Sequence, residues 1–146
     1  MLFRSERYLG FISELIRKGL PVSEENICWF GTSEKADLLA GKPDWLDRFV
    51  ENRLASCTAA VCYNDEIAYS LVRRLLKAGR RIPEDTAVVS FDNSHLCSLS
   101  PVPLTSLAHE RHKLGSSAAE ALLKLFRQKP ASGACFPWSL HERRSG

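Results

Sequence analysis

The sequence lacks the long apolar runs that mark membrane and exported proteins. No apolar stretch approaches the roughly 20 residues that a membrane-spanning helix needs. The opening, MLFRSERYLG, also lacks the apolar core of a secretory signal. We therefore expect a soluble, cytoplasmic protein with no membrane partner. Its 146 residues, 45% of them apolar, suit one ordinary domain.

Signatures of metal binding are scarce as well. The five cysteines make an odd count and form no CxxC pair, so no zinc site is indicated. Cys28, Cys62 and Cys135 fall in or beside apolar runs, where a free thiol packs as a small hydrophobe. The string HERH at 109–112 is not HExxH. We expect reduced core thiols, no metal and no cofactor.

Catalytic and nucleic-acid-binding signatures are missing too. There is no GxSxG elbow, and the eight glycines do not gather into a phosphate-binding loop. The net charge is only +3, and the basic residues are not interleaved with aromatic ones as on a nucleic-acid-binding surface. The chain itself is therefore expected to be neither an enzyme nor a direct binder of DNA.

What the sequence does contain is an alternation of helical and strand patterns. Apolar spacing predicts helices over about 6–18, 45–54, 67–77 and 110–127, the second of them capped by Asp44. Short apolar runs predict strands at 27–30, 59–63 and 87–91, an extended segment at 104–108, and a terminal strand or arm at 135–140. The segment 32–40 is ambiguous between loop and helical turn. This alternation predicts an α/β fold with a parallel sheet.

Two polar side chains stand where strand patterns end. Asn64 follows TAAVCY, and Asp92 follows TAVVSF. A strand, helix, strand unit is nearly always right-handed and leaves both strands parallel, so Asn64 and Asp92 should emerge side by side at one sheet edge. Open α/β sheets bind small molecules at such an edge. The alternative is local turn chemistry, in which Asn64 and Asp65 cap a helix and Asp92 starts an Asx turn.

These residue types suit a polyol. Its neighbouring hydroxyls are served by planar hydrogen-bonding groups, often beside an aromatic ring. Asp92 accepts, Asn64 donates and accepts, and Arg7 at the start of the first helix can donate. The aromatic candidates, among which spacing does not choose, are Trp29, Phe30 and Trp45.

Six motifs occur in order over nearly the whole chain. They are RYLGF at 7–11, AAVCYNDEIA at 59–68, LLKAGRRIPEDTAVVSFDNS at 75–94, PLTSL at 103–107, LGSSAAEALL at 114–123 and RRS at 143–145. Together they resemble the effector-binding domain of lactose/galactose-repressor-type transcription regulators. The strings CYNDE and FDNSH are most similar to the arabinose-repressor branch, in which this domain follows a winged-helix DNA-binding domain.

The resemblance implies a periplasmic-binding-protein-like (type I) fold of two subdomains with a sugar between them. This chain would be a partial domain: a Rossmann-like three-layer subdomain core at 1–95, a crossing segment and helix at 96–134, and a terminal strand or arm at 135–146. The helix at 110–127 would normally pack in the other subdomain. Its apolar stripe is therefore expected to be exposed and to drive self-association.

The resemblance also implies a function. In that family the Arg of RxxGF, the Asn of the ND pair and the first Asp of the FDD-like motif bind the sugar. This implies Arg7, Asn64 and Asp92 here, and Asn93 replaces the second Asp.

The implied protein is a non-enzymatic, sugar-sensing part of a repressor, whose effector is a pentose such as arabinose or another monosaccharide. A homodimer is expected, with operator DNA as a partner only through a domain absent from this chain. The open alternatives are a solute-binding protein of a sugar transporter and a small flavodoxin-like enzyme or receiver.

Overall fold

A computed structural model describes residues 6–40 and 45–146, and within them a four-stranded sheet forms the centre of the fold. The strands are β1 (Ala59–Val61), β2 (Ala87–Phe91), β3 (Thr105–His109) and β4 (Trp138–His141), in this order across the sheet. β1, β2 and β3 are parallel, and β4 is antiparallel to β3. The predicted α/β fold with a parallel sheet is confirmed, with one antiparallel strand added.

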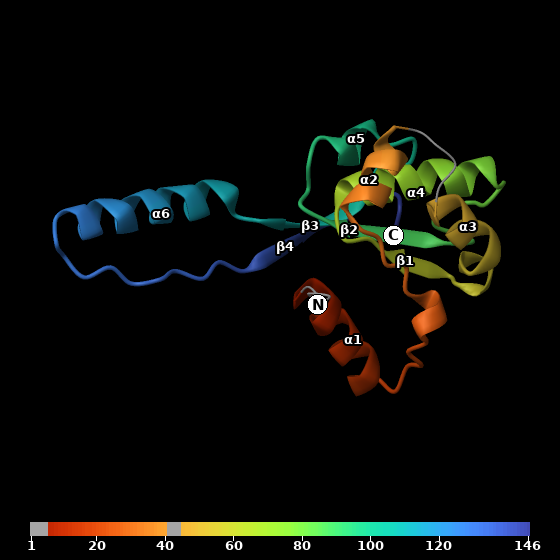
Figure 1. The fold of residues 1–146 in the computed structure, drawn as a ribbon, viewed down its shortest axis with the longest axis horizontal. Coiled ribbons are helices and arrows are strands. Elements are labelled where there is room, and N and C mark those ends of the chain that lie inside the picture. The colour runs from red at the N-terminus through yellow and green to blue at the C-terminus, as the bar shows by residue number, and fades with distance from the viewer. Residues whose placement is uncertain (1–5, 41–44) are drawn as a thin grey trace.

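Helices lie on both sides of this sheet, which gives three layers. They are α1 (Glu6–Arg17), α2 (Thr32–Leu39), α3 (Trp45–Asn52), α4 (Asp65–Lys77), α5 (Leu96–Leu99) and α6 (Arg111–Phe126), with short 3-10 turns η1 (Glu24–Asn26) and η2 (Leu54–Ser56). Figure 1 shows α2, α4 and α5 on one side of the sheet and α1 on the other. In the part of the chain that the structure describes, no helix is both long and apolar enough to cross a bilayer.

The helix α4 shows how local sequence builds this core. The Asn64 side chain caps it by accepting from the Ile67 N–H at 3.1 Å. Apolar residues four apart, such as Ala68 and Val72, are fully buried, and the helix contacts β2, α3 and α5. The chain leaves the helix at Gly79, whose φ of 75° suits glycine. The predicted helix and its stop are confirmed.

One predicted strand is wrong. Residues 27–30 form no strand, and Trp29 is 45% exposed. Within the described residues β1 pairs only with β2, so its outer edge is free and this apolar run does not pair with it. Phe30 packs against the core and Trp29 against Tyr8 instead. The ambiguous segment 32–40 contains α2. Asp44, the predicted cap of α3, lies outside the described residues.

The cysteine prediction holds in part. None of the five cysteines, all of which lie in the described residues, forms a disulfide. Cys62 is buried as expected and Cys28 is partly buried, but Cys135 is exposed. It lies in the connection between α6 and β4 rather than in a strand, so nothing packs over it.

α6 and the connection from it to β4 form an arm that projects from the rest of the molecule (Figure 1). No residue of α6 is buried, and Leu122, Leu125 and Phe126 are 63%, 61% and 87% exposed. The expectation that the stripe of this helix lacks cover is confirmed. Self-association, and the division of the chain into 1–95, 96–134 and 135–146, stay predictions.

Ser145, near the end of the sequence, binds the chain at the starts of β2 and β3. Ser145 is fully buried, donates from Oγ to Val88 O at 2.5 Å and accepts from the Thr105 N–H at 2.8 Å. Its backbone N–H donates to Pro103 O at 3.0 Å, and its carbonyl accepts from the Val88 N–H at 2.6 Å. The terminal RRS motif is thus a structural link between the starts of β2 and β3.

Candidate functional site

Arg7 joins the ends of the first two strands. It lies in the first turn of α1, where its Nη1 donates to Tyr63 O at 2.7 Å and its Nη2 donates to Asp92 Oδ1 at 3.0 Å. The Arg7 and Asp92 side chains are 27% and 35% exposed to solvent. Two of the residues predicted to bind a ligand are therefore in contact with each other and still reachable from solvent.

Asn64 stands beside them at the end of β1. Asn64 and Asp92 line one cavity of about 300 Å³, together with Lys35, Asp65, Glu66, Ser94, His95 and Leu96. The two strand ends therefore meet, as the handedness of the strand, helix, strand unit predicted. Because Asn64 uses its side-chain oxygen to cap α4, its NH₂ group is the part that can serve a ligand. Helix capping and ligand binding are compatible at this residue.

An aromatic corner surrounds the Arg7 guanidinium. The guanidinium carbon lies 5.0 Å from the ring centroids of Tyr63 and Phe91 and 5.5 Å from that of Trp138. Trp138 also packs against Phe91, with ring centroids 5.8 Å apart and the planes nearly perpendicular. Cation–π contacts of this kind hold the guanidinium in place and present apolar ring surface beside its donors.

The sequence prediction missed these three rings. Tyr63 and Phe91 directly precede the polar residues that end the two strand patterns, which is a signal that could have found them. Trp138 reaches the corner because β4 pairs antiparallel with β3, which places it opposite His109. No local pattern encodes that pairing.

The aromatic residues named from the sequence lie elsewhere. Phe30 and Trp45 stack on each other, with centroids 4.6 Å apart and planes 6° from parallel, and both pack against the core. Trp29 makes an edge contact with Tyr8 at 4.9 Å. None of the three lines the cavity beside Asn64, and neither do the rings around Arg7, so the cavity does not choose between the two aromatic sets and the contact stays a prediction.

Asp65 is a buried carboxylate that the sequence suggested only as a helix-capping residue. It is 2% exposed and accepts three hydrogen bonds. The donors are Ser90 Oγ at 2.5 Å and Ser106 Oγ at 2.8 Å, both to Oδ1, and the Ser94 N–H at 2.6 Å to Oδ2. Burial opposes ionisation, but hydrogen bonds from Ser90, Ser94 and Ser106 outweigh it and hold the pKa of Asp65 below its usual value.

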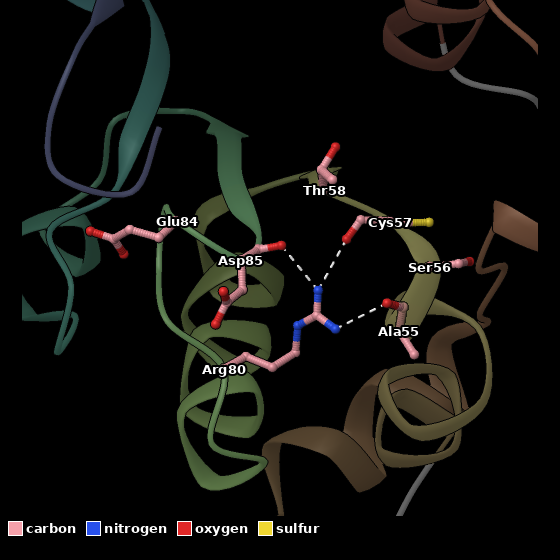
Figure 2. A pocket seen from close by; sticks show the side chains of 7 residues that line it. All are labelled: Ala55, Ser56, Cys57, Thr58, Arg80, Glu84 and Asp85. Carbon is pink, nitrogen blue, oxygen red and sulfur yellow. Dashed lines mark hydrogen bonds between the residues drawn. The ribbon is translucent and has the colours of Figure 1, made fainter.

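A second, larger cavity lies at the opposite ends of the strands. Its volume is about 420 Å³. Figure 2 shows the residues that line it: Ala55, Ser56, Cys57, Thr58, Arg80, Glu84 and Asp85. The Arg80 guanidinium donates hydrogen bonds to the carbonyls of Ala55, Cys57 and Asp85 at 3.0–3.2 Å. These donors tie loops together and are not offered to a ligand.

Within residues 6–40 and 45–146, no group of His, Cys, Asp and Glu could hold a metal ion. The corner at Arg7 is therefore the better candidate site.

Comparison with known proteins defines the class. The family described as periplasmic binding protein-like domain matches residues 3–146. The structure of a transcriptional regulator CelR–cellobiose complex superposes with a TM-score of 0.81 at 24% identity, covering 97% of this chain and 42% of that one. The chain belongs to the periplasmic binding protein-like family.

Its relatives are repressors. The arabinose metabolism transcriptional repressor of Geobacillus stearothermophilus is 33% identical over 125 residues, which cover 85% of this chain and 34% of that protein. The HTH-type transcriptional repressor PurR of Vibrio parahaemolyticus is 30% identical over 125 residues, again 85% of this chain and 35% of that protein. The chain thus spans about a third of the length of these curated relatives. The resemblance to the effector-binding domain of lactose/galactose-repressor-type regulators is confirmed.

Proposed function

We propose that this chain forms one wall of the sugar-binding site of a transcriptional repressor and is not an enzyme. The observation that carries the proposal is the Arg7 guanidinium, fixed between Tyr63 O and the Asp92 carboxylate and surrounded by aromatic rings. Such a corner offers a sugar both donors and acceptors for its hydroxyls and an apolar face for its ring.

The charges of the site support an uncharged polyol. Asp92 is paired with Arg7 at 3.0 Å, and Glu66 is paired with Lys35 at 2.6 Å. Asp92 and Glu66 therefore each have a cation beside them, whereas the third carboxylate, Asp65, is buried and held by hydrogen bonds, so the site lacks the positive excess that would bind an anion. Hydroxyl groups can join these pairs by accepting from the cation or donating to the carboxylate, because each side chain has further hydrogen-bonding capacity.

The finer identity of the ligand is part of the proposal. We infer a monosaccharide, with a pentose such as arabinose as the first candidate. The arabinose metabolism repressor is a relative over 85% of the chain, and a structural neighbour of the same fold was solved as a cellobiose complex. Binding to this chain alone should be weaker than binding to the complete cleft but still detectable at millimolar sugar, since the opposite wall belongs, in our proposal, to a second subdomain.

We further propose how binding is used. A sugar that binds the closed cleft better than the open one shifts the protein towards the closed state by its difference in affinity for the two. In a cytoplasmic homodimer this shift would change the spacing of DNA-binding domains and release operator DNA. Those domains lie outside residues 1–146. The alternatives, a transporter solute-binding protein and a flavodoxin-like enzyme or receiver, are not favoured, since the named relatives are repressors.

A thermal-shift screen against pentoses and hexoses at millimolar concentration tests the proposal. At least one sugar should raise the melting temperature of the wild-type chain, and Asp92→Ala should lose that shift. Asp85→Ala is a matched control: Asp85 is also paired with an arginine and has a side-chain exposure of 33%, against 35% for Asp92. No shift with any sugar, or an equal shift in Asp92→Ala, would contradict the proposal.

A further inference from the structure

The segment Asp92–Ser94 carries the ligand-site carboxylate in an unusual backbone conformation. Asp92 and Asn93 have φ angles of 99° and 46°, and neither is glycine. Residues with side chains rarely adopt positive φ, and two in succession persist only where the surroundings enforce them. The direction of the Asp92 carboxylate therefore depends on whatever holds this segment.

Asp65 supplies that hold through two routes. Its Oδ2 accepts directly from the Ser94 N–H at 2.6 Å. Its Oδ1 accepts from Ser106 Oγ at 2.8 Å, and the same hydroxyl accepts from the Asn93 N–H at 3.1 Å. A hydroxyl has a single proton, so donating it to Asp65 turns the oxygen lone pairs towards Asn93. Both amides that follow Asp92 are therefore fixed by one buried carboxylate.

We propose that Asp65 is the positioning residue of the sugar site: it fixes the amides of Asn93 and Ser94 and thereby directs the Asp92 carboxylate at Arg7. This inference rests on the proposed function, and it deepens it by naming a residue that acts on the site through the segment that carries Asp92. An ionised carboxylate suits the role because it only accepts hydrogen bonds, and all three of its partners donate. The lowered pKa of Asp65 keeps it in that form.

Arg111 and Arg143 hold the same segment from its outer side. Arg111 donates to the carbonyls of Asp92 and Asn93, and Arg143 donates to Asn93 Oδ1 at 2.8 Å. These contacts involve carbonyl and side-chain atoms, whereas Asp65 controls the amides. Loss of Asp65 should therefore loosen the segment without detaching it.

Ser90 and Ser106 provide a matched pair of variants. They are neighbours in the register of β2 and β3, both are fully buried, and both donate to Asp65 Oδ1. Only Ser106 also binds the backbone of Asn93. Ser90→Ala and Ser106→Ala each remove one buried hydrogen bond of Asp65, but only the second breaks a route to the segment that carries Asp92.

The experiment compares these variants, and Asp65→Asn, in the 146-residue chain. Sugar affinity is measured by calorimetric titration below all melting temperatures, and the exchange of the Asn93 and Ser94 amide protons is measured by NMR without sugar. Ser106→Ala and Asp65→Asn should weaken sugar binding by about tenfold, the effect of one lost charge-assisted hydrogen bond. Both variants should also speed exchange of the Asn93 amide proton. Asp65→Asn should in addition speed exchange of the Ser94 amide proton. Ser90→Ala should lower the melting temperature and leave affinity and exchange nearly unchanged.

Several results would overturn the inference. Equal losses of affinity in Ser90→Ala and Ser106→Ala would mean that Asp65 acts only through general stability. Unchanged exchange at Asn93 and Ser94 in Asp65→Asn would show that it does not hold the segment. A wild-type chain that binds no sugar would defeat the proposed function, and the exchange data would still decide whether Asp65 holds the segment.

Discussion

Arg7 and Asp92, 85 positions apart in the chain, meet in an ion pair of 3.0 Å that joins the first helix to the end of β2. The helix α1 has no buried residue of its own. Its position over the sheet edge therefore depends strongly on the contacts of Arg7 and on the packing of Tyr8 against Trp29. The arginine has a structural and a proposed ligand-binding role at once.

The first prediction concerns these two roles. Arg7→Lys keeps the positive charge but cannot serve Tyr63 O and Asp92 together, because a lysine ammonium lacks the planar fork of a guanidinium. Sugar affinity should fall about tenfold, whereas stability should fall by only about 1 kcal/mol, since the pair is partly exposed. Calorimetric titration and urea unfolding measure the two effects. Arg17→Lys, on the same helix and paired with Glu14, should change neither.

The second prediction concerns acid stability. The pKa of Asp65 is lower in the folded chain than its usual value, so protonation of this group favours unfolding. Its stabilising contribution should be complete above the usual aspartate pKa and should be lost as the pH falls through the lower folded-state value. Urea unfolding between neutral and acidic pH should therefore show a weaker acid-side decrease in Asp65→Asn than in wild type.

Asp85 is the control for this effect. A side-chain hydrogen bond from Arg81 lowers the pKa of Asp85 to about 2, but this pair lies at the surface, where salt screens it. High salt should weaken the contribution of Asp85 more than that of the buried Asp65. An acid-side decrease that is equal in wild type and Asp65→Asn would contradict the assigned cause.

The third prediction concerns the exposed face of α6. Leu125 and Phe126 are 61% and 87% exposed, and exposed apolar patches favour association. The wild-type chain should associate with rising concentration in sedimentation velocity and should bind an apolar dye. Leu125→Glu should reduce both, whereas Leu99→Glu, at a 65% exposed site on α5, should not. A wild-type chain that is strictly monomeric and binds no dye would show the prediction to be wrong.

The fourth prediction concerns thiol reactivity. Burial raises the pKa of Cys62 to about 12 and that of Cys97 to about 11, so neither forms a thiolate at neutral pH. Cys135 is exposed. Mass spectrometry after brief alkylation should find Cys135 modified and both buried thiols intact, and all five cysteines should react after denaturation. Rapid native labelling of Cys62 would contradict its burial.

Elements with their own local signals could be predicted from the sequence. The strand at 87–91 matches β2 residue for residue, because its apolar run is bounded by a turn and by polar residues. The convergence of Asn64 and Asp92 followed from the handedness of strand, helix, strand units rather than from any spacing. Long-range strand pairing could not be predicted in this way. Residues 27–30 have the composition of a strand but pair with no strand within the described chain.

The details of the site depended on register and could not be predicted. Trp138 reaches Arg7 only because β4 pairs antiparallel with β3. Asp65 meets Ser90 and Ser106 because the parallel register sets those two serines side by side under the start of α4. A serine in an apolar strand pattern carries no sign of which carboxylate it will meet.

Mapping sugar binding by NMR chemical shifts tests the central claim most directly. Titration of the isotope-labelled chain with the sugar that gives the largest thermal shift should perturb the signals of Arg7, the Asn64 side-chain amide, Asp92 and the Trp138 indole. The same titration of Asp92→Ala should leave the signals of Arg7, the Asn64 side-chain amide and the Trp138 indole unchanged. Shifts centred on Arg80 and Cys57, at the other cavity, or no shifts at millimolar sugar, would contradict the account.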